Sequence, residues 1–342
     1  ALVLLPRLDE PVVAAHPELR LRRAHGHRRL PRALHEARRV QGVHLFSILM
    51  STQLKYLGQL LLFGGFLLLT YPVLISVGKT ALPNTYMRNV PYPVGGYGHM
   101  HTRVREAANA GKVDILFLGS SHAYRGFDTR LWAKQGFSSF NLGSSAQSPI
   151  QSELLLKSTM KNLDPDVIIM EVNPILFSSD GVESALDLIA NRPIDLATVG
   201  MVVRENHIKT TNALFYGTLR QTLDFDDDLI EAAQEDDGQY IPGGFVERII
   251  GQYQPEAEAE QKENEEYVTE QIEAFDRIVQ LAQRTGKKLI LVEAPVPHFT
   301  YAHMLGPQRE FEQFMASRRA VFLNMNDKVA LTDTLHFTDG HH

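Results

Sequence analysis

The sequence contains no cysteine, and this absence removes several kinds of chemistry at once. A chain without thiols has no disulfide, no thiolate metal site and no cysteine nucleophile. An excess of positive charge is missing as well, because the formal net charge is -6. We therefore expect no nucleic-acid partner. No Gly-x-Gly-x-x-Gly run and no P-loop occurs, so a nucleotide cofactor has no support either.

Patterns of metal ligands are also scarce. The acidic run at 224–235 superficially resembles a calcium loop, but Leu229 stands where such a loop needs glycine. We interpret this run as a helix with a solvated face. His336 and His341 near the C-terminus lack a further cluster of residues at ligand spacing. The sequence therefore predicts no metal and no other cofactor.

One segment is too apolar for the surface of a soluble domain. Residues 56–77 contain no charged side chain, and Lys55 and Lys79 flank them. A stretch of about 20 apolar residues matches the thickness of a bilayer core. We expect an uncleaved membrane anchor at 50–79. A cleaved signal peptide and a buried core helix are the alternatives.

The first 49 residues differ in composition from the rest of the chain. They are rich in arginine and histidine, contain no lysine and do not begin with methionine. Met50 then opens a segment that reads like a natural start before an anchor. We expect residues 1–49 to be upstream sequence translated from an incorrect start. The alternative is a basic cytoplasmic arm, which would favour an outward orientation of the globular part by the positive-inside rule.

The remainder of the chain predicts an α/β domain at 111–342, which follows a polar connector at 80–110. Short apolar runs of strand length alternate with helical stretches, and this alternation indicates a parallel sheet covered on both faces. The predicted strands are 113–118, 139–142, 167–171, 288–293 and 320–323. Helices are predicted at 102–110 and 263–284, and Gly286 stops the second. The less regular residues from about 193 to 251 predict an insertion.

Polar residues follow three of these strands, at the edge where open parallel sheets bind ligands. They are Gly119-Ser120-Ser121, the segment NLGSSAQSP at 141–149, and Glu171-Val172-Asn173-Pro174; the chain then closes with DTLHFTDGHH. Together they supply the serine, backbone amides, asparagine, aspartate and histidine that acyl transfer requires. Each fragment alone has a simpler explanation, with Ser121 as a helix N-cap and Asn173 as a turn residue.

In this order the fragments resemble the SGNH (GDSL-like) hydrolase superfamily. The similarity is greatest to its membrane-anchored branch, which includes the envelope acyltransferases of the alginate-acetylation and D-alanylation type. The resemblance implies a three-layer α/β/α domain of flavodoxin-like strand order. It implies that Ser121 is the nucleophile and that its amide contributes to the oxyanion hole. Ala146, at the place of a family glycine, would give a second amide, and Asn173 would give its side-chain amide. Glu171 and Pro174 depart from the family pattern of glycine and aspartate.

The last block aligns with the family in two ways. FTDGHH gives Asp339 and His342 as the remaining members of a Ser-His-Asp triad, and we prefer this alignment because the preceding aromatic residue matches too. DTLH gives Asp333 and His336 as the alternative pair. The family normally continues into a further helix, so we expect the C-terminus to be truncated at His342.

The resemblance implies serine-dependent acyl transfer or ester hydrolysis, with an acylated envelope polysaccharide or a small acyl ester as substrate. It implies a single-pass protein of the bacterial cell membrane, with its catalytic domain outside the cytoplasm. A membrane-bound O-acyltransferase is the expected partner. Two alternatives stay open: a secreted or anchored esterase or lipase, and a non-catalytic protein that binds envelope polymers.

Overall fold

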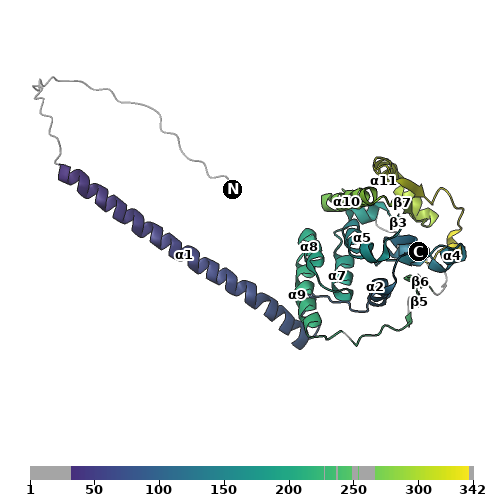
Figure 1. The fold of residues 1–342 in the computed structure, drawn as a ribbon, viewed down its shortest axis with the longest axis horizontal. Helices are drawn as coiled ribbons and strands as arrows, with labels where there is room; N and C mark the ends of the chain where they lie inside the picture. The colour runs from purple at the N-terminus through teal and green to yellow at the C-terminus, as the bar shows by residue number, and fades with distance from the viewer. Residues whose placement is uncertain (1–31, 227, 236–237, 249–252, 254–265, 339–342) are drawn as a thin grey trace, which may run out of the picture. The chain divides into compact units, whose positions relative to one another are not determined.

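The computed structural model describes residues 32–226, 228–235, 238–248, 253 and 266–338 (Figure 1). Its centre is a five-stranded parallel sheet with the order β2-β1-β3-β7-β8. These strands are β1 (Ile115–Leu118), β2 (Ser139–Asn141), β3 (Val167–Glu171), β7 (Lys288–Glu293) and β8 (Val321–Asn324). All five predicted strands are therefore confirmed, to within two residues at their ends. The order is that of a flavodoxin-like α/β fold.

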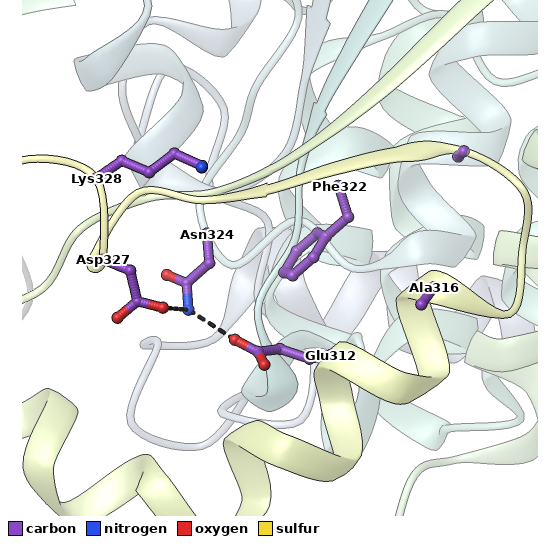
Figure 2. Close-up of a pocket in the computed structure, with 7 residues that line it drawn as sticks. Glu312, Ala316, Phe322, Asn324, Asp327 and Lys328 are labelled. Carbon is purple, nitrogen blue, oxygen red and sulfur yellow. Dashed lines mark hydrogen bonds between the residues drawn. The ribbon is translucent and has the colours of Figure 1, made fainter.

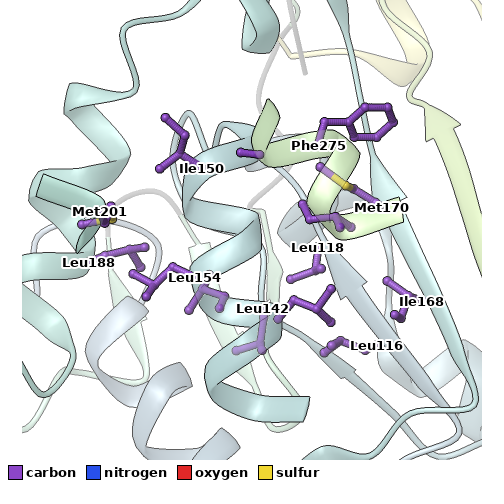
Figure 3. Close-up of a cluster of buried hydrophobic side chains, with 14 of the residues drawn as sticks. Leu116, Leu118, Leu142, Ile150, Leu154, Ile168, Met170, Leu188, Met201 and Phe275 are labelled. Carbon is purple, nitrogen blue, oxygen red and sulfur yellow. The ribbon is translucent and has the colours of Figure 1, made fainter. Parts of the chain in front are cut away.

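The inner strands β1, β3 and β7 are largely buried on both sides, as parallel strands between helices must be. Alternate residues face opposite layers, so each of the inner strands β1, β3 and β7 contributes to two hydrophobic clusters. The larger cluster lies against α5 (Pro149–Leu163) and α10 (Thr269–Thr285), and Figure 3 shows residues of it such as Leu116, Leu118, Ile168, Met170 and Leu154. The smaller cluster contains Ile115, Phe117, Ile169 and Val292, packed against Phe127 and Trp132. Trp132 lies on α4 (Thr129–Lys134), which covers that face.

The remaining helices are α1 (Arg32–Ala81), α2 (Met100–Asn109), α3 (Ser121–Gly126), α6 (Pro174–Ser178), α7 (Val182–Asn191), α8 (Leu196–Glu205), α9 (Ile208–Thr222), α11 (His298–Ala316) and α12 (Asp333–His336). The predicted helix at 263–284 is present as α10, which begins later and ends at Gly286 in the left-handed conformation expected of a C-cap. The helix predicted at 102–110 is present as α2. Its Met100 and Arg103 are fully buried, so the end of the connector is part of the folded domain.

The predicted insertion forms α8, α9 and a small antiparallel sheet of β4 (Gln234–Glu235), β5 (Gly238–Ile241) and β6 (Phe245–Glu247). The prediction of a helix at 224–235 is wrong, because the described residues of this run form turns and then β4. Asp226 is buried instead of solvated, and the guanidinium of Arg220 donates to its Oδ1 at 2.6 Å. That ion pair fixes a turn where the composition alone suggested a helix.

Within the described residues, one helix is long and apolar enough to cross a membrane. The qualifying segment of α1 is Met50–Ala81, with a mean hydropathy of 2.2 and only 11% of its most apolar stretch buried. A core helix would be mostly buried, so the exposed leucines argue against that alternative. Residues 67–342 form one compact unit, to which the end of α1 belongs. There the hydroxyl of Tyr71 donates to Oδ1 of Asn212 on α9 at 2.7 Å.

Candidate active site

The turn after β1 places a serine at the start of a helix, at the carboxyl edge of the central sheet. Gly119 has a φ of 134°, and a Cβ at this position would lie 2.6 Å from the Cβ of Glu171. Only glycine fits both the conformation and the space. Ser120 is the N-cap of α3, since its Oγ accepts the N–H of His122 at 3.3 Å. Ser121 is therefore the first residue of α3, partly exposed, and the capping role belongs to its neighbour.

The loop after β2 lies directly beside this turn. The N–H of Ser144 donates to the carbonyl of Gly119 at 3.1 Å, which ties the two loops together. Buried Asn141 strengthens the connection, because its Nδ2 donates to the carbonyl of Ala123 at 2.8 Å and its Oδ1 accepts the N–H of Gly143 at 3.0 Å. Ala146 has a φ of 46° in this loop. A left-handed alanine is strained, which fits a position where a glycine was expected.

The segment after β3 brings Asn173 to the adjacent strand end. Asn173 is the N-cap of α6, and its Oδ1 accepts the N–H of Leu176 at 3.2 Å. Its Nδ2 donates one hydrogen to Oε1 of Glu171 at 3.1 Å. An asparagine amide carries two donor hydrogens, and among the described residues no partner takes the second. The turn role and an available donor are thus combined in one side chain.

Glu171 is a fully buried carboxylate between these elements. Its Oε2 accepts the N–H of Ser120 at 2.7 Å, while Oε1 accepts the amide of Asn173. The Nδ1 of His122 lies 3.7 Å from Oε1 and 3.4 Å from the Oγ of Ser120. Ser120 is only 4% exposed, and its Oγ already serves as the cap of α3. Ser120 and His122 therefore form no second accessible nucleophile–base pair, and Glu171 links the turn to Asn173.

A buried arginine, Arg103, donates a hydrogen bond to the loop after β2. The sequence alone did not identify it as part of the site. The Nη1 of Arg103 donates to the carbonyl of Gly143 at 2.8 Å, and its Nε donates to that of Gly244 at 3.0 Å. Complete burial lowers the pKa of Arg103, and burial raises the pKa of nearby Asp187 to about 8, against the influence of the arginine. The available signal was a charged residue between Met100 and Ala107 on the apolar face of α2.

The described residues include only one of the two predicted acid–base pairs. Asp339 and His342 lie outside them. In the alternative pair, Oδ1 of Asp333 accepts the N–H of His298 at 3.0 Å and lies 2.9 Å from its Nδ1. His336 is exposed, and its Nδ1 lies 2.9 Å from the backbone nitrogen of Thr332. Although burial opposes it, hydrogen bonding to His298 lowers the pKa of Asp333. Asp333 is thus engaged with His298, not with His336.

A pocket of about 520 Å³ lies elsewhere, between α11 and β8 (Figure 2). Asn324 lies at its centre, and its Nδ2 donates to Oε1 of Glu312 at 3.0 Å and to Oδ2 of Asp327 at 3.4 Å. None of the candidate catalytic or oxyanion residues that the structure describes lines this pocket. In the part of the chain that the structure describes, no group of three or more histidine, aspartate or glutamate residues could hold a metal ion.

Comparisons with known proteins add little to this geometry. No family model and no curated protein matches the chain. Among solved structures, a "putative acylhydrolase" from Bacteroides fragilis is similar at 12% identity, with a TM-score of 0.32 over 72% of this chain and 88% of the other. A likeness at that TM-score carries no conclusion about the activity of this chain, and the function has to be argued from its own residues.

Proposed function

We propose that this protein is a serine-dependent enzyme that hydrolyses acyl esters or transfers their acyl groups, with Ser121 as the nucleophile. Ser121, Ala146 and Asn173 follow β1, β2 and β3, which are neighbours in the sheet. Their elements are also joined by hydrogen bonds from Ser144 to Gly119 and from Ser120 to Glu171. A hydroxyl with potential oxyanion donors on the neighbouring strand ends supports acyl transfer, which needs both groups.

The observation that carries this proposal is the state of the Asn173 amide. One hydrogen of Nδ2 is fixed by Glu171, so the side chain is held in one orientation. No described residue accepts the second hydrogen, so it can be donated to a ligand. A donor that is already oriented stabilises a developing oxyanion without reorganisation during the reaction. A mere turn residue would need only the capping bond from its Oδ1.

In the proposed mechanism, His342 takes the proton of Ser121 as its oxygen attacks the ester carbonyl, and Asp339 orients the imidazole. The negative charge on the carbonyl oxygen is stabilised by the amides of Ser121 and Ala146 and by Nδ2 of Asn173. The alcohol leaves with a proton from His342, and an acyl-serine remains. Water then resolves the acyl-enzyme in a hydrolase, whereas a sugar hydroxyl resolves it in an O-acyltransferase. These steps require no cofactor.

The proposed setting is the outer face of a bacterial cell membrane, with α1 as a single-pass anchor. The length, apolarity and exposure of Met50–Ala81 support attachment to a membrane. An anchored acyl-transfer domain fits an acylated envelope polysaccharide, with a membrane-bound O-acyltransferase as partner. Deletion of the anchor is then expected to impair modification of the polymer more than hydrolysis of a soluble ester. Equal loss of both activities would contradict this setting.

The test of the catalytic proposal is fluorophosphonate labelling of the natural full-length protein, with the labelled residue located by mass spectrometry. We expect the label on Ser121 and its loss in Ser121→Ala and His342→Ala. Ser120→Ala is the matched control, because it removes a neighbouring hydroxyl that serves as a cap, and it should still be labelled. A folded protein without label would overturn the proposal in favour of a polymer-binding protein. Product analysis with a polysaccharide acceptor then separates a transferase from an esterase.

A further inference from the structure

Helix α8 has two faces of different character. Thr198, Met201 and Val202 are buried against the domain. The opposite face carries Leu196, Ala197, Val199, Gly200 and Val203, with Leu196 90% and Val203 71% exposed. A Cβ placed on Gly200 would meet nothing within 4 Å, so no described residue covers this face. An apolar stripe along a whole exposed helix is the signature of a contact surface rather than of a solvated one.

The charges at the border of this face are largely paired, and the guanidinium of Arg204, one turn after Gly200, binds the buried carboxylate of Glu153. The carboxylate of Asp195 is occupied by Arg192 and by the N–H of Thr198. The carboxylate of Glu205 is partly buried and accepts the side-chain amide of Gln151. Lys209 is exposed beside Ile208, which is itself 56% exposed. A lysine at the rim of an apolar stripe suits a headgroup layer, where the amine stays in water while the stem lies on apolar surface.

The C-terminal end of α1, the helix that could span a membrane, packs against α9, the helix that follows α8. Tyr71 of α1 binds Asn212 of α9 and stacks edge-on against Phe215. Ile75 joins Tyr216 in a small buried cluster. Helix α9 in turn packs against α8, and Figure 1 shows the two side by side. Helix α8 is therefore a direct neighbour of the helix on which the apolar end of α1 docks.

We infer that the outer face of α8 rests in the headgroup and upper acyl region of the membrane that α1 enters. This inference rests on the membrane attachment proposed above and adds a second contact to it. A single membrane helix would not fix the orientation of the domain relative to the bilayer. An additional amphipathic contact would hold one side of the domain against the bilayer. The partner of the α8 face is thus the lipid surface, because α8 packs against the helix on which the end of α1 docks.

The absence of cysteine allows a direct test with single-cysteine spin labels on the full chain in nanodiscs of phosphatidylcholine with a minor share of phosphatidylglycerol. Leu196→Cys and Val203→Cys probe the α8 face. Leu131→Cys is the matched control, because Leu131 is 56% exposed on α4. Leu62→Cys probes the anchor. Collision with oxygen, which enters lipid, is compared with collision with a water-soluble nickel complex.

We expect the oxygen-to-nickel ratio to be several times greater at 196 and 203 than at 131, and to be highest at 62. Water-like values at 196 and 203 with a lipid-like value at 62 would overturn the inference while leaving the anchor intact. Low collision with both reagents at 196 and 203 would also overturn it, since a protein surface would then cover the face. A water-like value at 62 would reject the membrane attachment itself.

Discussion

The side-chain amide of Asn173 donates a 3.1 Å hydrogen bond to the fully buried carboxylate of Glu171. The other carboxylate oxygen accepts the N–H of Ser120, the residue before the candidate nucleophile. One acceptor group thus joins the turn after β1 to the segment after β3. A carboxylate suits this place because both incoming groups are donors, and an ionised carboxylate has acceptors only.

Replacement of this carboxylate is expected to reduce activity without removing any group that touches the substrate. In Glu171→Gln, one donor would face the new NH2 group, and an unsatisfied buried donor costs about 1–3 kcal/mol. Asn173 then loses its fixed orientation. We expect kcat on a soluble ester to fall about ten- to a hundredfold with little change in KM.

The matched control is Glu293→Gln. Glu293 is also a buried carboxylate at the end of a strand, where burial raises its pKa to about 7. It accepts from Gln308, and among the described residues no hydrogen bond joins it to Asn173. Activity should be largely retained in this variant. Equal losses of kcat in the two variants would show that Glu171 acts only through general stability.

The two roles of Asn173, as the N-cap of α6 and as a proposed oxyanion donor, can be separated by substitution. In Asn173→Ser the hydroxyl can still cap α6, because serine is a favoured N-cap, but the amide donor is gone. We expect kcat to fall about 10²- to 10³-fold while the melting temperature stays close to that of the parent. Asn173→Ala should lose the same activity and also about 1 kcal/mol of stability. Retained activity in the serine variant would reject Asn173 as an oxyanion donor.

The left-handed conformation of Ala146 predicts a stabilising change. Ala146→Gly relieves about 1–2 kcal/mol of backbone strain but makes the unfolded chain more flexible at a cost of about 0.4–1 kcal/mol. The net expectation is a gain of about 0.5 kcal/mol in the free energy of unfolding, measured with urea. Ala133→Gly is the control of opposite sign, since Ala133 lies exposed in α4 and should lose about 1 kcal/mol. Destabilisation by both changes would mean that Ala146 is not strained.

The sequence predicted the central sheet well because its inner strands β1, β3 and β7 are short apolar runs, largely buried on both faces. Val167–Glu171 and Lys288–Glu293 have the predicted bounds. The small sheet β4-β5-β6 was missed because its strands, with the sequences QE, GQYI and FVE, contain no apolar run of strand length. It is held by contacts that no local pattern records, such as the N–H of Asn141 donating to the carbonyl of Gly243 at 2.8 Å.

The sequence could predict individual residues of the candidate site, but it could not predict the hydrogen bonds that join them. Ser121 follows a strand and a glycine, and that local pattern is visible in the sequence. The role of Glu171 depends on donors from two separate elements, so in the sequence it appeared only as a departure from a family motif. Arg103 lies 40 residues from Gly143, whose carbonyl it binds, and only the packing of α2 brings them together. The assignment of Asp339 and His342 stays a prediction.

A buried ion-pair network around Glu153 predicts how stability depends on pH. Glu153 of α5 is 1% exposed and is bound by Arg277, by Lys157 and by Arg204. Burial alone would raise its pKa, but the three cations outweigh burial and lower the pKa from 4.5 to about 2. A carboxylate with a depressed pKa stabilises the fold fully above its unfolded pKa. The stabilisation is lost as the pH falls from 4.5 toward about 2.

The depression corresponds to about 3 kcal/mol of stability, which Glu153→Gln removes at neutral pH. The deficit of this variant in urea unfolding should be large near pH 7 and should shrink as the pH approaches 3, because the parent then loses the same interaction. Glu273→Gln is the matched control. Glu273 pairs with the same Arg277 at 3.5 Å but is 62% exposed, and exposed pairs contribute about 0–1 kcal/mol. A deficit of Glu153→Gln that is independent of pH would mean that its packing, not its charge, supports the junction of α5, α8 and α10.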